Sequence, residues 1–227
     1  MEGMKEFPDK YFDLAIVDPP YGIGIVEMQN KNADSRRTTS SGGHWRKYKE
    51  NDWDDKIPSE NYFTELKRIC NNRIIWGGNY FALHTTKCWL IWDKIGRDNR
   101  ADGEMAWTSF DKPMKIFRYS RADAYINDCD MKIHPTQKPV QLYKWILHNY
   151  AKPGMKIIDT HVGSASSIIA FLDYGCDWIG FEIDEDYHKA ASERIEIHKK
   201  RPKPFFTDVE LADKNIKQKG FFDDNKP

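Results

Sequence analysis

The sequence has no long hydrophobic run and few cysteines, and each absence excludes a class of protein. No apolar stretch approaches the roughly 18 residues that a membrane span needs, and residues 1–5, Met-Glu-Gly-Met-Lys, do not form a signal peptide. The four cysteines, Cys70, Cys88, Cys129 and Cys176, lack the C-x-x-C spacing of a zinc site. We therefore expect a cytoplasmic protein with reduced thiols, no metal site and no membrane partner.

The sequence also lacks net charge and internal repeats. Its 35 Lys and Arg residues balance 35 Asp and Glu residues, so affinity for nucleic acid would have to come from a local basic patch. Hydrophobic residues make up 40% and charged residues 31% of the 227 positions, which excludes a disordered chain. This length suits one compact domain with an elaborated loop.

Short apolar runs alternate with amphipathic stretches, which predicts a mostly parallel α/β sheet. Strands are expected at 12–17, 73–76, 88–92, 105–109, 114–120, 156–159 and 178–183. Helices are expected to start at Ser59 and near Pro139, and to span 164–174 and 185–199. Residues 27–56 are polar and carry Ser-Ser-Gly-Gly at 40–43, so we expect a long surface loop there.

The first chemical motif is Asp18-Pro19-Pro20-Tyr21, which follows the first expected strand. Two prolines end the strand there, and ligands of open α/β sheets bind at the carboxyl ends of strands. The Asp18 carboxylate and the Pro19 carbonyl would form a pair of acceptors for an exocyclic amino group, and Tyr21 would stack on the same flat base. An ordinary proline turn is the alternative.

A second motif, Asp-Thr-His-Val-Gly-Ser-Ala-Ser at 159–166, joins a strand to a helix. Its small residues would let a cofactor approach the backbone, although a plain strand-to-helix turn is at least as compatible with a single glycine. Glu182 lies 19 residues after Gly163, at the end of the next expected strand, where a carboxylate binds ribose hydroxyls. A solvated charge is the alternative for Glu182, and His161 is given no catalytic role.

Four segments together resemble the amino-group DNA methyltransferases of the DNA N4/N6 methylase family. They are residues 18–21, 134–139 (His-Pro-Thr-Gln-Lys-Pro), 159–166 and 181–184 (Phe-Glu-Ile-Asp). Their order, with the catalytic motif before the cofactor motif, resembles the β-class permutation over about residues 4–200. The resemblance implies a Rossmann-like methyltransferase fold that depends on S-adenosylmethionine, with a mostly parallel sheet in a three-layer α/β/α arrangement.

The resemblance also implies a role for each motif. The catalytic residues would be Asp18, Pro19, Pro20 and Tyr21. The S-adenosylmethionine site would comprise Asp18, Lys138, Asp159, Thr160, His161, Gly163, Ser164, Glu182 and Ile183, with Glu182 on the ribose and Lys138 near the methionine end. Residues 1–200 would form one catalytic domain and residues 201–227 a peripheral tail. Residues 76–80 and 92–94 resemble further family segments.

The sequence departs from the family pattern in two places. The family's cofactor motif usually reads Asp-Pro-Phe-x-Gly-Ser-Gly-Thr, whereas Thr160 and His161 replace Pro-Phe and Ala165 replaces the last glycine. Ala165 therefore needs a negative φ or a tolerant turn. Relatives also carry an acidic strand before the segment that corresponds to residues 1–9. This chain starts after it, so we expect the adenine end of the cofactor site to be incompletely walled.

An enzyme that modifies a base has to take it out of the duplex, so a grip on DNA is expected. Basic residues gather at 30–49 against a single acidic residue, Asp34, and a second basic segment at 111–133 would be a small target-recognition region. The candidate DNA contacts are Lys31, Arg36, Arg37, Trp45, Arg46, Lys47, Arg118 and Arg121. A solvated basic loop without a partner is the alternative.

The expected activity is methyl transfer from S-adenosylmethionine to the N6 amino group of adenine in double-stranded DNA. Asp18 favours adenine, because cytosine-N4 enzymes of the family more often carry serine there. A cytosine-N4 enzyme, a catalytically impaired DNA-binding relic, and a methyltransferase of RNA or of protein amides remain alternatives. Cytosine C5 chemistry is excluded because no cysteine follows a proline. The small size favours an orphan or prophage enzyme, and a restriction-modification partner and a homodimer remain open.

Overall fold

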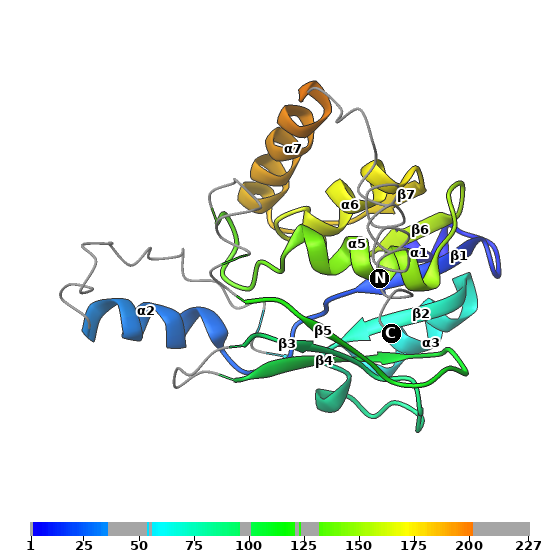
Figure 1. Cartoon of the computed structure of the whole chain (residues 1–227), viewed down its shortest axis with the longest axis horizontal. Helices are drawn as coiled ribbons and strands as arrows, with labels where there is room; N and C mark the ends of the chain where they lie inside the picture. Colours follow the sequence, from blue (N-terminus) through cyan, green and yellow to red (C-terminus); the bar gives the residue numbers. More distant parts are fainter. Residues whose placement is uncertain are drawn as a thin grey trace, which may run out of the picture.

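The computed structural model describes residues 2–35, 54, 56–95, 101–120, 123 and 132–201. A seven-stranded sheet forms its centre, in the order β5-β3-β4-β2-β1-β6-β7 (Figure 1). The strands are β1 Phe12–Val17, β2 Cys70–Trp76, β3 Leu90–Asp93, β4 Gly103–Thr108, β5 Lys115–Arg118, β6 Lys156–Asp159 and β7 Asp177–Gly180. The sheet that the alternating sequence pattern predicts is therefore present.

Strand direction decides which residues meet at each edge of the sheet. β1 runs parallel to β2 and β6, β7 runs parallel to β6, and β5 runs parallel to β3. Only β4, among the described strands, is antiparallel to its neighbours, β2 and β3. The carboxyl ends of the parallel strands and the amino end of β4 therefore share one edge, which we term the carboxyl edge.

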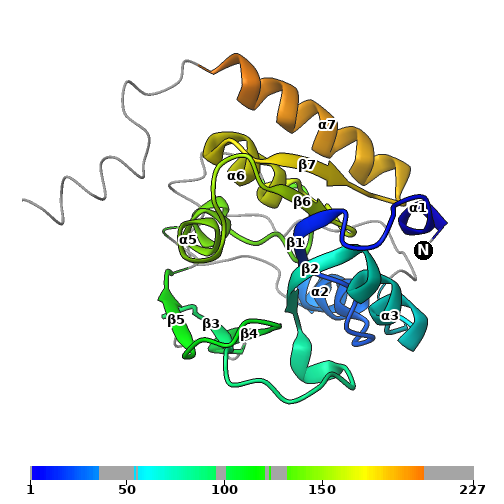
Figure 2. The same cartoon turned by 90° about the vertical axis from the view of Figure 1, so that its right-hand side faces the viewer.

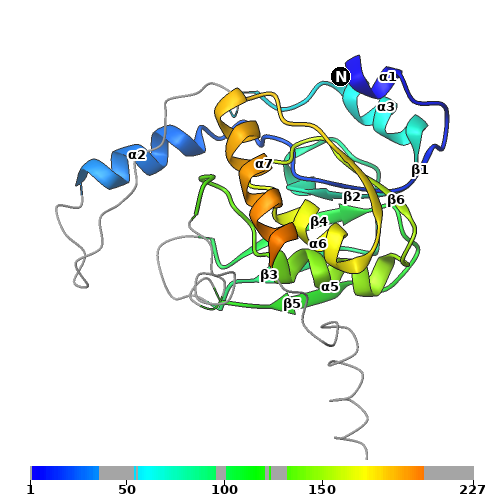
Figure 3. The same ribbon diagram turned by 90° about the horizontal axis from the view of Figure 1, so that it is seen from above.

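Helices cover both faces of the sheet, in three layers (Figure 2). They are α1 Glu2–Lys5, α2 Ile25–Ser35, α3 Glu60–Ile69, α5 Val140–Tyr150, α6 Ser166–Tyr174 and α7 Glu185–Lys200, with a 3-10 helix, η1, at Gly78–Tyr80. α5, α6 and α7 lie on one face and α1 and α3 on the other, while α2 extends away from the body (Figures 1 and 3). In the described part of the chain, no helix is long and apolar enough to span a membrane.

The core is divided by the sheet into two clusters. Leu14 and Ile16 of β1 belong to the cluster under α5 and α6, whereas Ala15 and Val17 belong to the cluster under α3, which includes Leu66. Side chains alternate between the faces of a strand, and a strand covered on both faces reads as an unbroken apolar run. This explains why the sequence of β1 shows no polar alternation beyond Asp13.

The expectation of a surface loop over residues 27–56 was wrong for residues 27–35, which belong to α2. α2 is polar along most of its length, so it lacks the apolar stripe that identifies a helix in a sequence. An ion pair one turn apart, between Glu27 and Lys31 at 2.5 Å, lies on its exposed surface. The strand expected at 178–183 also ends earlier, at Gly180, which leaves Glu182 in the following loop.

Candidate active site

The carboxyl edge brings together three acidic residues that are far apart in the sequence. Asp18 follows β1, Asp159 ends β6 and Glu182 follows β7. A cavity of about 480 Å³ lies at this edge, within the range of small-molecule and cofactor sites. Its lining comes from four parts of the chain. They are Asp18 and Pro20; His134, Thr136, Gln137, Lys138 and Tyr143; residues 161–164 with Ser166; and residues 182–184 with Tyr187.

The Asp18 carboxylate is held from two sides. Its Oδ1 accepts a hydrogen bond from the Tyr21 hydroxyl at 2.6 Å, and its Oδ2 accepts one from Lys138 Nζ at 2.5 Å. Burial raises the pKa of Asp18 above its usual value, and Lys138 opposes that rise. Each carboxylate oxygen has two acceptor positions, so this arrangement fixes the orientation of Asp18 and leaves further acceptor capacity.

Lys138 also contacts a second carboxylate, Glu104, which the sequence did not single out. Lys138 Nζ lies 3.0 Å from Glu104 Oε2, and Lys94 Nζ lies 2.5 Å from Glu104 Oε1. Burial alone would raise the pKa of Glu104, but the two lysines lower it to about 2. Glu104 reaches the site because β4 is antiparallel and begins at the carboxyl edge.

The Tyr21 ring lies on a glycine backbone. Gly77 has a φ of +67°, and a Cβ atom there would lie 2.1 Å from the Tyr21 ring. The ring of Tyr80 stacks on Tyr21 with centroids 4.9 Å apart and an interplanar angle of 11°. Burial, together with the charge of Asp18, raises the pKa of Tyr21 well above its usual value, so the hydroxyl stays protonated. Gly77 and Tyr80 thus form the seat of the Tyr21 ring.

Asp54 anchors the loop between β1 and α2. Its Oδ1 accepts from the backbone N–H groups of Tyr21 at 2.8 Å and Gly22 at 3.1 Å, and its Oδ2 accepts from Ile25 N at 3.0 Å. Ile25 is the first residue of α2, so Asp54 caps this helix from a distant part of the chain. Sequence reasoning missed Asp54 because it lies 33 residues from Tyr21 and belongs to no local motif.

Asp159 supports the loop at 160–165, between β6 and α6, from inside the protein. Its Oδ1 accepts from the backbone N–H of His161 at 3.0 Å, and its Oδ2 accepts from the Ser167 hydroxyl at 2.6 Å. Burial raises the pKa of Asp159 to about 7. Thr160 hydrogen-bonds to the Tyr62 hydroxyl at 2.7 Å. Among the described residues, Asp159 and Thr160 are not part of the cavity lining, whereas His161, Gly163, Ser164, Glu182 and Ile183 are.

Glu182 ties the loop at 160–165 to the segment that follows β7. Its Oε2 accepts from Gly163 N at 2.8 Å, and its Oε1 accepts from Asp184 N at 3.0 Å. The neighbouring Ile183 is 93% exposed at the rim of the cavity. A fixed carboxylate beside an exposed apolar side chain and a glycine backbone fits a ribose and a flat base. The residues present therefore fit an adenosine-containing cofactor.

The turn at the start of α6 tolerates an alanine in the left-handed region. Ala165 is buried and has a φ of +63°, so the turn accepts it without the negative φ that a non-glycine residue prefers. Arg194 of α7 holds this turn, because its Nη1 donates to the Ser164 carbonyl at 2.7 Å and to the Ser166 hydroxyl at 3.0 Å. Arg194 is another positioning side chain that the sequence motifs did not indicate.

Two histidines line the cavity as neutral rings. Burial lowers the pKa of His161 to about 4 and that of His134 to about 3. The His161 ring packs edge-on against Tyr62, with centroids 5.5 Å apart, and the His134 ring packs against Tyr187 at 4.4 Å. Both side chains therefore shape the cavity and carry no positive charge at neutral pH.

The predicted DNA contacts are only partly described by the structure. Lys31 is exposed on α2, and Arg118 is exposed at the carboxyl end of β5, where it pairs with Asp93 at 3.2 Å. Arg36, Arg37, Trp45, Arg46, Lys47 and Arg121 lie outside the described residues. Lys112, in the second basic segment, donates to the Asn149 carbonyl near the end of α5, so this segment does not lie entirely at the carboxyl edge.

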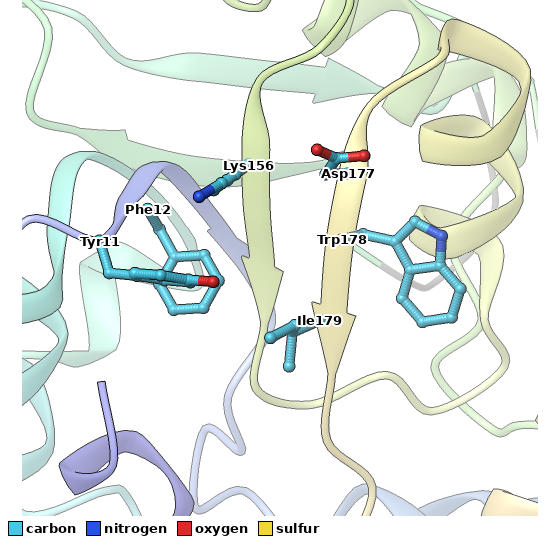
Figure 4. Close-up of a pocket in the computed structure, with 6 residues that line it drawn as sticks. All are labelled: Tyr11, Phe12, Lys156, Asp177, Trp178 and Ile179. Atoms are coloured by element: carbon cyan, nitrogen blue, oxygen red, sulfur yellow. The ribbon is translucent and has the colours of Figure 1, made fainter. Parts of the chain in front are cut away.

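A smaller cavity, of about 140 Å³, lies near the amino ends of β1, β6 and β7 (Figure 4). Tyr11, Phe12, Lys156, Asp177, Trp178 and Ile179 line it. Lys156 Nζ lies 4.5 Å from the centre of the Tyr11 ring. None of the predicted site residues contributes to this lining, so the candidate site is the larger cavity.

Comparison with known sequences finds similarity to methylases. A family model described as DNA methylase, of the N6/N4 methyltransferase type, matches residues 75–193. A protein of Escherichia coli (strain K12) described as "Putative methylase YubD" is 23% identical over 212 residues, which covers 85% of each chain. The type II methyltransferase M.HinfI of Haemophilus influenzae is 23% identical over 262 residues, which covers 96% of this chain and 71% of that protein.

Solved structures confirm the fold. The PvuII DNA methyltransferase (cytosine-N4-specific) superposes with a TM-score of 0.52 at 13% identity, covering 92% of this chain and 86% of that chain. M1.HpyAVI in complex with S-adenosylmethionine gives a TM-score of 0.50 at 16% identity, covering 85% and 92%. The chain belongs to the N6/N4 DNA methylase family, a group of DNA methyltransferases that take their methyl group from S-adenosylmethionine.

Proposed function

We propose that this chain methylates the N6 amino group of adenine in double-stranded DNA after the base has been flipped out of the duplex. The observation that carries the proposal is the position of Asp18, whose carboxylate lies in the wall of the cofactor-sized cavity and is fixed by Tyr21 and Lys138. An exocyclic amino group offers two N–H donors. The Asp18 carboxylate and the Pro19 carbonyl would accept them, while Tyr21 stacks on the base.

In this mechanism the protein makes a poor nucleophile reactive. The lone pair of the adenine amino nitrogen is delocalised into the ring. By accepting both N–H donors, Asp18 and the Pro19 carbonyl favour a pyramidal nitrogen whose lone pair points toward the methyl donor, and such positioning contributes several kcal/mol. The negative charge of Asp18 stabilises the positive charge that develops on the nitrogen, and an Asp18 oxygen then receives the amino proton. When bound, S-adenosylmethionine supplies an already activated methyl group on a sulfonium.

The cofactor would be held by the loops that line the cavity. We assign the ribose to Glu182, the adenine side to the apolar rim at Ile183, and close backbone approach to Gly163 and Ser164. Lys138 would lie near the methionine end, beside Asp18. Asp159 and Thr160 would act indirectly, by fixing the loop.

The DNA would approach the carboxyl edge, where the catalytic motif lies. Lys31 on the protruding α2 and Arg118 at the end of β5 would contact phosphates, together with the predicted contacts at 36–47 and Arg121. We propose that residues 1–200 form one catalytic domain of a cytoplasmic enzyme; the cavity draws its lining from residues as far apart in the sequence as Asp18 and Tyr187, which supports a single domain.

The proposal is tested by methyl transfer from labelled S-adenosylmethionine to unmethylated bacterial DNA, with the nucleosides resolved by mass spectrometry. The full chain should form N6-methyladenine. Asp18→Ala should abolish the product. Scanning calorimetry should show that this variant still folds, and titration calorimetry should show that the wild type binds the cofactor.

Other outcomes would change the conclusion in defined ways. N4-methylcytosine as the product would keep the mechanism and replace adenine by cytosine, as in the name of the PvuII enzyme. Cofactor binding without any methylated nucleoside would overturn the proposal and favour a DNA-binding relic. Product formed equally by Asp18→Ala would remove Asp18 from the catalytic role.

A further inference from the structure

Four charged side chains form a row of ion pairs at the carboxyl edge. Positive and negative charges alternate along it, in the order Lys94, Glu104, Lys138 and Asp18. Lys94 Nζ lies 2.5 Å from Glu104 Oε1, Glu104 Oε2 lies 3.0 Å from Lys138 Nζ, and Lys138 Nζ lies 2.5 Å from Asp18 Oδ2. The side chain of Lys138 is only 2% exposed and that of Lys94 only 9%. Ion pairs this well shielded from water interact much more strongly than surface pairs.

The four residues come from different parts of the fold. Lys94 directly follows β3, Glu104 is the second residue of β4, Lys138 precedes α5, and Asp18 follows β1. Their meeting depends on the reversed direction of β4, which places its amino end among the carboxyl ends of the other strands. No local sequence motif contains Glu104.

We infer that Glu104 is a positioning residue: by sharing Lys138 with Asp18, it keeps the Asp18 carboxylate a strong hydrogen-bond acceptor for the target amino group. The inference rests on the proposed function, in which Asp18 binds that amino group. It adds a residue of β4 to the machinery of the reaction, and Glu104 itself does not line the cavity in the described part of the chain.

One positive charge, that of Lys138, is divided between two carboxylates. Lys138 lies between two carboxylates, so its charge is shared between Asp18 and Glu104. Without the Glu104 charge, Lys138 would face Asp18 alone, and the pKa of Asp18 would fall. A less basic carboxylate accepts a proton or a hydrogen bond less strongly. The surplus positive charge would also oppose the positive charge that develops on the amino nitrogen.

The titratable groups around Asp18 in the described structure are few. They are Lys138, Glu104, Tyr21, Tyr62 of α3, Tyr143 of α5 and Asp159 at the end of β6. Burial raises the pKa of Tyr21 and of Tyr143 well above the usual value, so both phenols stay neutral. Glu104 raises the pKa of Asp18 and Lys138 lowers it, so these two are the opposing charges closest to Asp18.

The first test measures Asp18 directly, by a carbon NMR titration of aspartate carboxyl groups in the full chain without cofactor or DNA. Asp18→Asn assigns the signal. Glu104→Gln should lower the pKa of Asp18 by about one unit. Lys94→Met should raise it, because Glu104 then acts more strongly on Lys138. Glu104→Asp, which keeps the charge, should stay close to the wild type, and Glu193→Gln on the exposed surface of α7 controls for loss of a remote negative charge.

The second test measures single-turnover methyl transfer to DNA as a function of pH. For Glu104→Gln we expect a plateau rate about tenfold lower, an acidic limb moved to lower pH, and an unchanged dissociation constant for S-adenosylmethionine. Glu104→Asp should recover most of the rate. A purely structural role would lower the rate in both Glu104 variants without moving the acidic limb.

The inference is overturned if the pKa of Asp18 is unchanged in both charge variants, or if Glu104→Gln and Lys94→Met shift it in the same direction. Should Glu104→Gln not fold, the direction of the shift in Lys94→Met decides alone. A wild-type chain without methyl transfer would end the proposed function, while the NMR titration would still decide whether Glu104 acts on Asp18.

Discussion

At the scale of single residues, Gly77 sets the position of the Tyr21 ring. An alanine there would need a left-handed backbone, at a cost of about 1 kcal/mol, and its Cβ would lie 2.1 Å from the ring. We predict that Gly77→Ala displaces Tyr21, breaks its hydrogen bond to Asp18 and lowers the single-turnover rate at least about tenfold. The affinity for S-adenosylmethionine should change little, because Gly77 is not part of the described cavity lining.

A matched control separates backbone strain from the clash with Tyr21. Gly154 has a φ of +80°, and a Cβ atom there would meet nothing within 4 Å. Both Gly154→Ala and Gly77→Ala should lower the melting temperature through backbone strain. Gly154→Ala should keep the wild-type rate of methyl transfer. Equal rates in the two variants would show that the seat of Tyr21 does not matter for the reaction.

Asp159 is a residue whose protonation couples to folding. Its pKa is raised by burial to about 7, above the usual 3.8 of an unfolded chain, so the folded protein binds the proton more tightly. The resulting stabilisation is complete below pH 3.8 and is lost as the pH rises toward 7. Asp159→Asn cannot ionise at this position. We therefore predict that the melting temperature of Asp159→Asn minus that of the wild type increases as the pH rises from 5 to 8.

Thermal unfolding of the cofactor-free chain across this pH range checks the prediction. Asp177→Asn, at the exposed start of β7, serves as the control for the same Asp-to-Asn change at the surface. A constant difference between Asp159→Asn and the wild type from pH 5 to 8 would contradict the assignment.

At the scale of elements, the start of α2 depends on one distant carboxylate. Asp54 accepts hydrogen bonds from Tyr21, Gly22 and Ile25, and replacing one acceptor oxygen by an NH₂ group leaves a backbone N–H opposite a donor. We predict that Asp54→Asn lowers the free energy of local opening in residues 21–35 by about 1–2 kcal/mol. Hydrogen exchange in these residues should therefore be faster. The rate of methyl transfer should also fall, because the loop carries Tyr21.

Hydrogen exchange resolved by mass spectrometry measures this effect locally. Asp184, which accepts from Asp186 N and Tyr187 N at the start of α7, provides a matched capping residue. Asp184→Asn should speed exchange in the first turn of α7 and leave residues 21–35 unchanged. Faster exchange spread evenly over the sheet in Asp54→Asn would mean that Asp54 stabilises the whole fold rather than this loop.

The elements differ in how well the sequence predicts them, for physical reasons. β1 and β6 are short apolar runs that end in turn-forming residues, and their positions are confirmed. α3 is amphipathic, and its helix is confirmed from Glu60. α2 was missed because a polar helix that protrudes from the body has little apolar face to reveal it.

At the scale of the whole molecule, the site divides into local and distant contributions. Asp18, Gly163 and Glu182 stand in short motifs after strands, and the cavity includes or adjoins all three. Asp54 and Glu104 reach the site only through contacts between segments far apart in the chain. Glu104 depends in addition on the antiparallel direction of β4. Strand order and direction set such contacts, and a single sequence does not contain them in local form.

The β1–β6 ladder, in which Leu14 pairs with Ile157 and Ala15 with Ile158, joins the strands β5-β3-β4-β2-β1 to the strands β6-β7. Residues 12–118 supply β1 to β5 and Asp18, which we propose binds the base, and residues 132–201 supply β6, β7 and most of the described cavity lining. Each side is thus a contiguous stretch of gene. Recombination between relatives could exchange the stretch that faces the base and keep the stretch that faces the cofactor, so target choice and cofactor use are free to evolve at different rates.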